Sequence, residues 1–84
     1  MSGGLAVAMS TSRMEERHVT RYYVNKNAQA NGDHEVHQEG CAYMPSNRID
    51  LGLFDNCRDA VREAKKHYTQ VNGCVYCSKA CHTQ

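Results

Sequence analysis

The last eleven residues of this chain hold three cysteines and a histidine, within the stretch VNGCVYCSKACHTQ at residues 71–84. Two of the cysteines have the C-x2-C spacing at which a pair of thiolates converges on one tetrahedral zinc ion. The ligands predicted from this ending are Cys74, Cys77, Cys81 and His82, with Cys41 or Cys57 as substitutes that the fold can bring near. A zinc site at the C-terminus is therefore one interpretation.

Other interpretations of these cysteines stay open. Reduced cysteines are small and apolar and are often buried, so they can simply pack a thin core. They can also form a disulfide. A thiol-redox role for Cys74 and Cys77 requires a lowered thiol pKa, which usually comes from a position at the start of a helix after a strand. Here the pair is expected to follow a helix instead, which disfavours redox chemistry.

A second group of candidate ligands lies in GDHEVH at residues 32–37. It does not match the zincin motif H-E-x-x-H, because the second histidine comes one residue too early. In a strand, residues three apart point to opposite faces, so His34 and His37 cannot reach one ion without a bend. Turn chemistry and a polar strand face account for most of this segment. A direct role for a histidine as a ligand or proton carrier is the alternative.

Charge and hydropathy exclude several classes of protein. Ten basic and nine acidic residues are interspersed and leave a net charge of +1, so the basic stripe of a nucleic-acid-binding protein is missing. The apolar run LAVAM at residues 5–9 is much shorter than the roughly 20 residues of a membrane-spanning helix. No Lys or Arg precedes it, whereas a signal peptide has a positively charged segment before its apolar region. We expect a cytoplasmic protein, where free thiols or metal ligands are favoured over disulfides.

The size of the chain limits its core. Its 84 residues include twelve Leu, Ile, Val or Phe, so we expect one small domain with little apolar surface to bury. Such scaffolds often depend on metals, disulfides or oligomers. Residues 1–17 show no periodicity and predict a disordered tail before a single domain at residues 18–84. Met9 and Met14 are alternative translation starts to Met1.

Three segments have the composition and alternation of β-strands: residues 18–26, 34–41 and 48–54. The Asn31-Gly32 pair between the first two predicts a turn, and therefore a hairpin. In the third segment, Ile49, Leu51 and Leu53 are expected to share the buried face, because alternate residues of a strand point to the same side.

A helix is predicted after Asp55 or Asn56, since either side chain can cap the first turn. Its apolar stripe recurs at helical period and consists of Cys57, Ala60, Val61, Ala64, Tyr68 and Val71. Gly73 is expected to end it in the left-handed conformation. A short Cys-rich helix or turn follows, in which residues 74, 77 and 81 share one face. Together these elements predict an α+β fold, a three-stranded antiparallel sheet packed by one amphipathic helix.

The order of motifs along residues 21–83 also resembles a small family of uncharacterised bacterial proteins. The shared motifs are GDHEVH, a cysteine before a proline-containing loop, LGLFDNCRDAVREAKKHY and NGCVYCSKACH. The order strand–strand–strand–helix is similar to the YegP-like α+β fold, although units of that fold often occur as tandem repeats and this chain has room for one. Neither resemblance implies an activity or a catalytic residue.

No complete catalytic constellation accompanies the patterned sheet and helix. The sequence therefore favours a non-enzymatic domain that binds a protein or a small molecule, as a monomer or a homodimer, and neither nucleic acid nor membranes. The alternatives are a structural zinc-binding module and a thiol-redox protein that uses Cys74 and Cys77.

Overall fold

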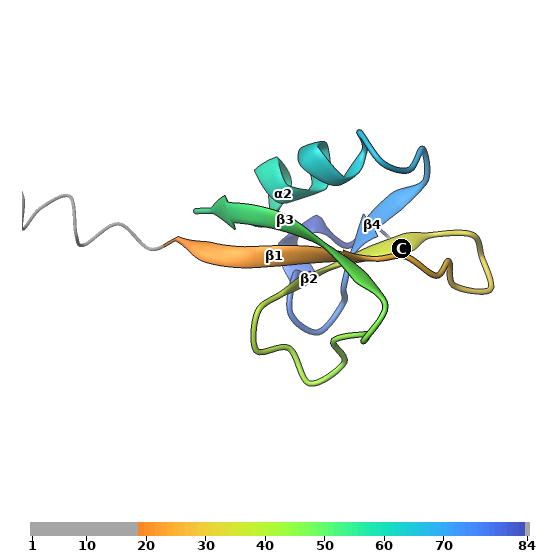
Figure 1. Ribbon diagram of the computed structural model, residues 1–84, viewed down its shortest axis with the longest axis horizontal. Helices are drawn as coiled ribbons and strands as arrows, with labels where there is room; N and C mark the ends of the chain where they lie inside the picture. Colours follow the sequence, from red (N-terminus) through yellow and green to blue (C-terminus); the bar gives the residue numbers. More distant parts are fainter. Residues whose placement is uncertain (1–18, 84) are drawn as a thin grey trace, which may run out of the picture.

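Residues 19–83, which the computed structural model describes, form a small mixed sheet with a helix packed on one face (Figure 1). In chain order the elements are β1 (Thr20–Asn25), β2 (His34–Gln38), β3 (Arg48–Phe54), α2 (Cys57–Ala64), β4 (Val71–Gly73) and the 3-10 turn η1 (Lys79–Cys81). The strands lie in the order β3-β1-β2-β4. The α+β class is confirmed for these residues, whereas the predicted tail at residues 1–17 lies outside them.

The hairpin of β1 and β2 forms where the sequence predicts it. The two strands are antiparallel, with Val24 opposite Val36. In the connecting loop Gly32 has a φ of +96°, a conformation that glycine adopts easily. The side chain of Asn31 accepts a hydrogen bond of 2.9 Å from the backbone N–H of Asp33 and so fixes the turn.

A β-bulge in β3 changes which of its side chains face the helix. Gly52 and Asp50 lie opposite consecutive residues of β1, so Leu51 between them is an extra residue. Leu51 is buried, but Leu53 is 56% exposed, and Phe54 packs against the core instead. The prediction that Leu53 shares the buried face is wrong, because the extra residue reverses the alternation beyond it.

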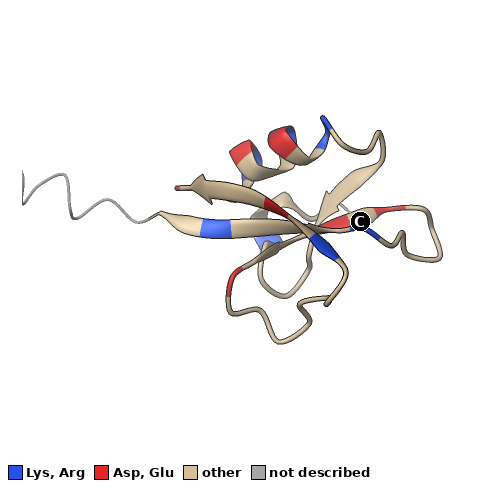
Figure 2. Cartoon of the chain, in the orientation of Figure 1, with Lys and Arg blue, Asp and Glu red and all other residues tan. Residues whose placement is uncertain are grey.

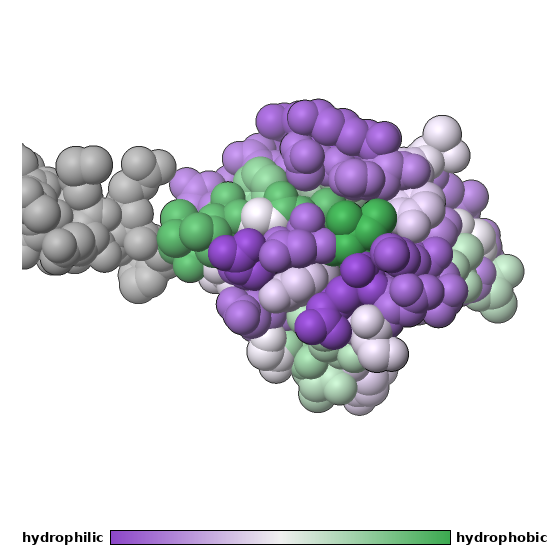
Figure 3. Space-filling view, in the orientation of Figure 1, coloured by the Kyte–Doolittle hydropathy of each residue, from purple (hydrophilic) through white to green (hydrophobic). Residues whose placement is uncertain are grey.

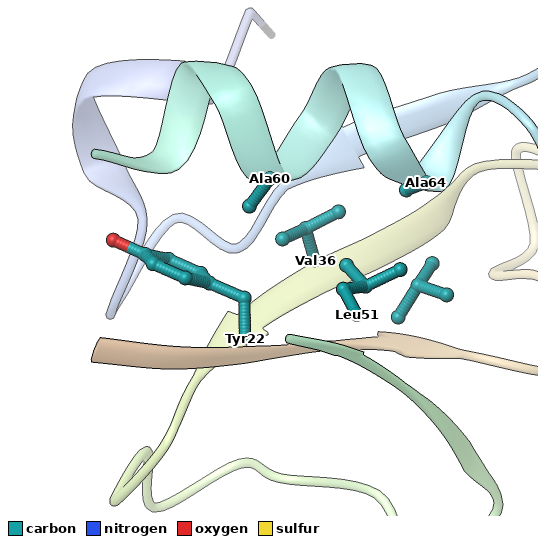
Figure 4. Close-up of a cluster of buried hydrophobic side chains, with 6 residues drawn as sticks. Tyr22, Val36, Leu51, Ala60 and Ala64 are labelled. Atoms are coloured by element: carbon teal, nitrogen blue, oxygen red, sulfur yellow. The ribbon is translucent and has the colours of Figure 1, made fainter. Parts of the chain in front are cut away.

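The hydrophobic core lies between the sheet and α2 (Figure 4). Its buried members are Tyr22, Val24, Val36, Leu51, Ala60 and Ala64. The buried residues of the helix, Ala60 and Ala64, contribute only methyl groups, and its half-buried residues Cys57 and Val61 pack against the same core. A core of this size supplies limited hydrophobic stabilisation, so cross-links outside it matter more than they would in a larger protein.

The helix begins as predicted but ends earlier. Asn56 is its N-cap, and the Asn56 side chain accepts a hydrogen bond of 2.8 Å from the backbone N–H of Asp59. The last helical residue is Ala64, so the predicted continuation to Val71 is wrong. Tyr68 and Val71 match the helical period, but both lie beyond the end of the helix, and Val71 begins another element.

That element is a fourth strand. β4 pairs in parallel with β2, with Val71 opposite His34 and Gly73 opposite Val36. The ring of Tyr68 stacks on the ring of His34 with centroids 3.6 Å apart and planes within 6°. The sheet therefore has four strands and is mixed, and the prediction of a three-stranded, wholly antiparallel sheet is wrong. The edge of β2 provides unpaired backbone groups for the returning chain, and local periodicity does not reveal such a pairing.

The surface carries both signs of charge and one hydrophobic band. Acidic and basic residues are interspersed along the strands and the helix (Figure 2). Hydrophobic surface runs over β3, below the hydrophilic outer face of α2 (Figure 3). Leu53 on β3 is an exposed large apolar side chain. Within residues 19–83, no helix has the length and apolar character needed to cross a bilayer.

Candidate metal centre

Four side chains that can bind a metal meet at one end of β2. They are His37, Cys41, Cys74 and Cys77, and their ligand atoms all lie within 4.8 Å of one another. The residues come from β2, from the turn after it and from the turn after β4. Two stretches of chain that are far apart in sequence, residues 37–41 and 74–77, therefore supply one compact set of one nitrogen and three sulfur atoms.

Strand alternation places His37 in this group. Its neighbour Val36 lies in the core beneath α2, so His37 points to the opposite face of the sheet, where it is 1% exposed. His34 stacks on Tyr68 and does not belong to the group. The two histidines therefore have different surroundings in the structure.

A tight turn at the end of β2 brings Cys41 back toward His37. The backbone N–H of Cys41 donates a hydrogen bond of 3.0 Å to the carbonyl of Gln38. Gly40, with a φ of +92°, allows the reversal. Cys41 is half-buried and its sulfur lies 4.0 Å from the sulfur of Cys74.

The parallel pairing of β4 places the C-x2-C pair. The backbone N–H of Cys74 donates to the carbonyl of Val36 at 2.9 Å, so the turn that follows begins beside the end of β2. Backbone N–H groups then point at both sulfurs. Tyr76 donates to Cys74 Sγ at 3.4 Å and Gln38 donates to Cys77 Sγ at 3.3 Å. The donor from Gln38 favours the thiolate form of Cys77, which is the form that binds metal.

The separations of the ligand atoms suit a tetrahedral ion. A tetrahedron with metal–sulfur bonds of about 2.3 Å has edges of about 3.8 Å. Cys77 Sγ lies 3.8 Å from His37 Nδ1, and the sulfurs of Cys41 and Cys74 are 4.0 Å apart. The group therefore needs only small side-chain adjustments to surround one ion.

Burial sets the protonation of the site. It lowers the pKa of His37, which keeps the imidazole neutral at neutral pH. Burial, with a further contribution from Cys41, raises the pKa of the Cys77 thiol to about 12. Nε2 of His37 lies 3.5 Å from Oε1 of Glu35, while Nδ1 faces Cys77. A neutral imidazole with its Nδ1 toward three thiols is ready to bind a metal once the thiol protons leave.

The remaining residues predicted as ligands have other partners. Cys81 forms a disulfide with Cys57, joining η1 to the start of α2. The ring of His82 bonds through Nδ1 to the carbonyl of Gly73 at 2.9 Å. The structure thus brings the terminal C-x2-C pair together with His37 and Cys41. The signal that sequence reasoning missed is the short His-x3-Cys spacing of these two residues, which forms a second ligand pair.

The side chain of Asn72 links the C-terminal segment to the sheet next to the four ligand residues. This buried side chain accepts hydrogen bonds from the backbone N–H groups of Gly73 at 2.9 Å and Thr83 at 3.0 Å. Its amide also donates to Asp33 at 3.2 Å. The C-terminal segment is therefore connected to the rest of the fold in three ways: by the hydrogen bonds of Asn72 to the sheet, by the disulfide to α2 and by the ligand group at the end of β2.

Gly73 is required by close packing and not by a left-handed helix end. A Cβ added there would lie 2.8 Å from Cys81 Cβ and 2.8 Å from the carbonyl oxygen of Ser78. We expect Gly73→Ala to lower the free energy of unfolding by about 1–3 kcal/mol and to weaken metal binding, because the displaced backbone carries Cys74. Urea denaturation and competition with a zinc chelator measure the two effects.

Gly52→Ala is the control for that substitution. Gly52 has a φ of +103° and open space around its missing Cβ, so alanine there costs about 1–2 kcal/mol through the backbone alone. Gly52 lies on β3, away from the ligand group, and its substitution is expected to leave metal affinity unchanged. Equal metal affinity in both variants contradicts the role assigned to Gly73.

No family model, curated protein or solved structure matches this chain. The resemblances to a family of bacterial proteins and to the YegP-like fold therefore stay predictions, and function has to be inferred from the residues of the site.

Proposed function

We propose that this chain is a small, non-enzymatic binding domain whose C-terminal segment is held on the sheet by one zinc ion. The proposed ligands are His37, Cys41, Cys74 and Cys77. One observation carries the proposal: four donor atoms from two stretches of chain that are far apart in sequence lie within 4.8 Å of one another.

The donor set selects the kind of metal. Three soft sulfurs and an imidazole suit zinc, whereas calcium and magnesium prefer oxygen ligands. No carboxylate belongs to the group. Four protein ligands fill a tetrahedron and leave no open position for a substrate or a reactive water, which supports a structural role for the zinc and a non-enzymatic domain.

The protonation of Cys77 disfavours the thiol-redox alternative. A redox-active cysteine needs a lowered pKa so that it is a thiolate at neutral pH. Burial raises the pKa of Cys77 to about 12, and its neighbour Cys74 is 1% exposed. Both features suit thiols that are buried or bound to a metal. They do not suit a redox pair, in which one thiolate must be accessible to a substrate.

Native mass spectrometry with two matched histidine variants tests the zinc proposal. We expect the wild-type protein, purified without chelator, to carry one zinc ion, and His37→Ala to lose it. His82→Ala removes the same type of side chain from the predicted C-terminal ligand set but not from the group within 4.8 Å, and is expected to keep its zinc. A zinc-free wild-type protein after reconstitution, or loss of zinc only in H82A, contradicts the proposal.

Glu35 is expected to strengthen the binding of zinc through His37. Its carboxylate oxygen lies 3.5 Å from His37 Nε2, and the two side chains are 14% and 2% exposed. A carboxylate behind a metal-bound imidazole fixes the ring and makes it a better donor, and removing such a partner typically weakens metal binding by about 10–100-fold. We therefore expect about a tenfold loss of zinc affinity in Glu35→Gln, measured by competition with a chromophoric chelator.

Glu39→Gln is the matched control, because Glu39 follows the same strand but is exposed. Its zinc affinity is expected to equal that of the wild-type protein. If E35Q and E39Q bind zinc equally well, Glu35 has no part in the site.

A further inference from the structure

A groove of about 370 Å³ separates α2 from η1, the two elements that the Cys57–Cys81 disulfide joins. Its lining consists of Arg58, Val61, Arg62, Lys65, Ala80 and Cys81. The volume falls in the lower part of the range of small-molecule sites, about 300–1,000 Å³. None of the four proposed zinc ligands lines it, so the groove is a separate feature of the molecule.

The charge of this groove is one-sided although the whole chain is nearly neutral. Arg58, Arg62 and Lys65 are four and three residues apart and therefore share one helix face, where like charges repel one another. The lining contains no acidic residue. Arg62 pairs with Asp59 at 3.2 Å at the rim. Within residues 19–83, the side chains of Arg58 and Lys65 have no hydrogen-bond or ion-pair partner.

The groove also offers apolar contact. Val61 and Ala80 line the groove together with the three cationic side chains. Cys81, which is disulfide-bonded and therefore uncharged, completes the lining. Guanidinium groups bind oxyanions through paired N–H donors, and an ammonium group adds a point charge. A ligand that contacts both the cationic and the apolar side chains of this groove has a compact group with at least two negative charges, attached to a small apolar moiety.

We infer that this groove binds a small organic phosphate monoester. The phosphate dianion contacts Arg58, Arg62 and Lys65, because its tetrahedral oxygens can accept from three donors at once. The apolar body lies over Val61 and Ala80. This inference does not depend on the zinc ion, but it supplies a ligand class for the binding domain proposed above.

Phenyl phosphate is the probe that tests it, since it combines a dianion with an apolar ring. We expect a saturable chemical-shift titration of the 15N-labelled full chain at low salt, with a Kd of about 1 mM or tighter. The shifts are expected on α2 and η1. Arg58→Ala and Lys65→Ala are each expected to weaken binding by about fivefold or more, because each removes a charged donor.

Lys66→Ala is the matched control. Lys66 lies in the turn directly after α2, and its side chain is 70% exposed. Its ammonium pairs with Glu63 at 3.1 Å, and it does not line the groove. The Kd of the K66A variant for phenyl phosphate is expected to stay within about twofold of the wild-type value. An equal loss of affinity in K66A and R58A shows a diffuse attraction to a solvated basic face and overturns the inference.

Two further ligands separate the parts of the recognition. Inorganic phosphate is expected to bind the same residues more weakly, and benzyl alcohol not to bind. Benzyl alcohol binding as tightly as phenyl phosphate, or no saturable shift with phenyl phosphate, overturns the inference. A protein that binds phenyl phosphate but carries no zinc rejects the zinc proposal and keeps this one.

Discussion

Removal of the proposed zinc ion by EDTA is expected to lower the free energy of unfolding by several kcal/mol and to release the segment after β4 from the sheet. Structural zinc contributes apparent binding free energies of about 10–16 kcal/mol in small zinc-binding peptides, and this energy is folding energy when the site exists only in the folded chain. Domains of this size have only about 5–15 kcal/mol to lose. Urea unfolding followed by circular dichroism measures the difference.

Addition of metal to the stripped protein provides the control. Zinc is expected to restore the original unfolding curve, whereas magnesium is not, because sulfur and imidazole ligands do not suit it. Unfolding curves that coincide with and without EDTA, for a protein shown to carry zinc beforehand, are incompatible with a stabilising role for the ion.

The pH dependence of zinc binding has a defined sign. Without metal, the raised pKa of Cys77, about 12, keeps its proton on the thiol at neutral pH. Zinc must displace that proton, so its apparent affinity falls as the pH falls and proton release accompanies binding. Addition of zinc to a weakly buffered solution with a pH indicator should therefore acidify it. A titration without proton release contradicts binding through Cys77.

Loss of the Cys57–Cys81 disulfide is expected to destabilise the protein by about 3 kcal/mol. The two cysteines are 24 residues apart in sequence, and the cross-link removes conformational freedom from the unfolded chain in proportion to the logarithm of that loop length. The double variant Cys57→Ser with Cys81→Ser tests this in urea, with wild-type protein under non-reducing conditions as the reference.

Zinc content separates the effect of the disulfide from that of the metal. The double serine variant is expected to keep one zinc ion, because neither Cys57 nor Cys81 belongs to the four-residue ligand group. Cys41→Ser, which removes one thiol from that group, is the matched contrast and is expected to lose zinc. A double variant that is as stable as the wild-type protein, or one that loses its zinc, refutes the assignment of separate roles.

Local patterns in the sequence were sufficient to predict the first three strands, the β1–β2 hairpin and the start of α2. These features depend on alternation, on a turn at Asn31-Gly32 and on a cap at Asn56, all of which act over a few residues. The bulge at Leu51 was not predicted, because apolar and polar residues alternate regularly along β3 and only the pairing with β1 reveals the extra residue. The end of α2 was mistaken because Tyr68 and Val71 fit the helical period by coincidence.

The candidate site divides in the same way. The C-x2-C spacing of Cys74 and Cys77 identifies a pair of sulfurs that can share an ion, and strand alternation separates His34 from His37. The sequence by itself thus determined which residue types and which local pairs are available for binding a metal.

Only the tertiary structure decided which pairs meet. Five cysteines allow many combinations, and spacing along the chain places Cys81 and His82 nearest to the C-x2-C pair. The parallel register of β4 on β2 instead puts Cys74 beside Val36 and Cys77 beside Gln38, within reach of His37 and Cys41. The same return of the chain carries Cys81 to the helix, where it bonds to Cys57. Such contacts join residues far apart in sequence, and they are set by strand pairing and burial, which no local pattern encodes.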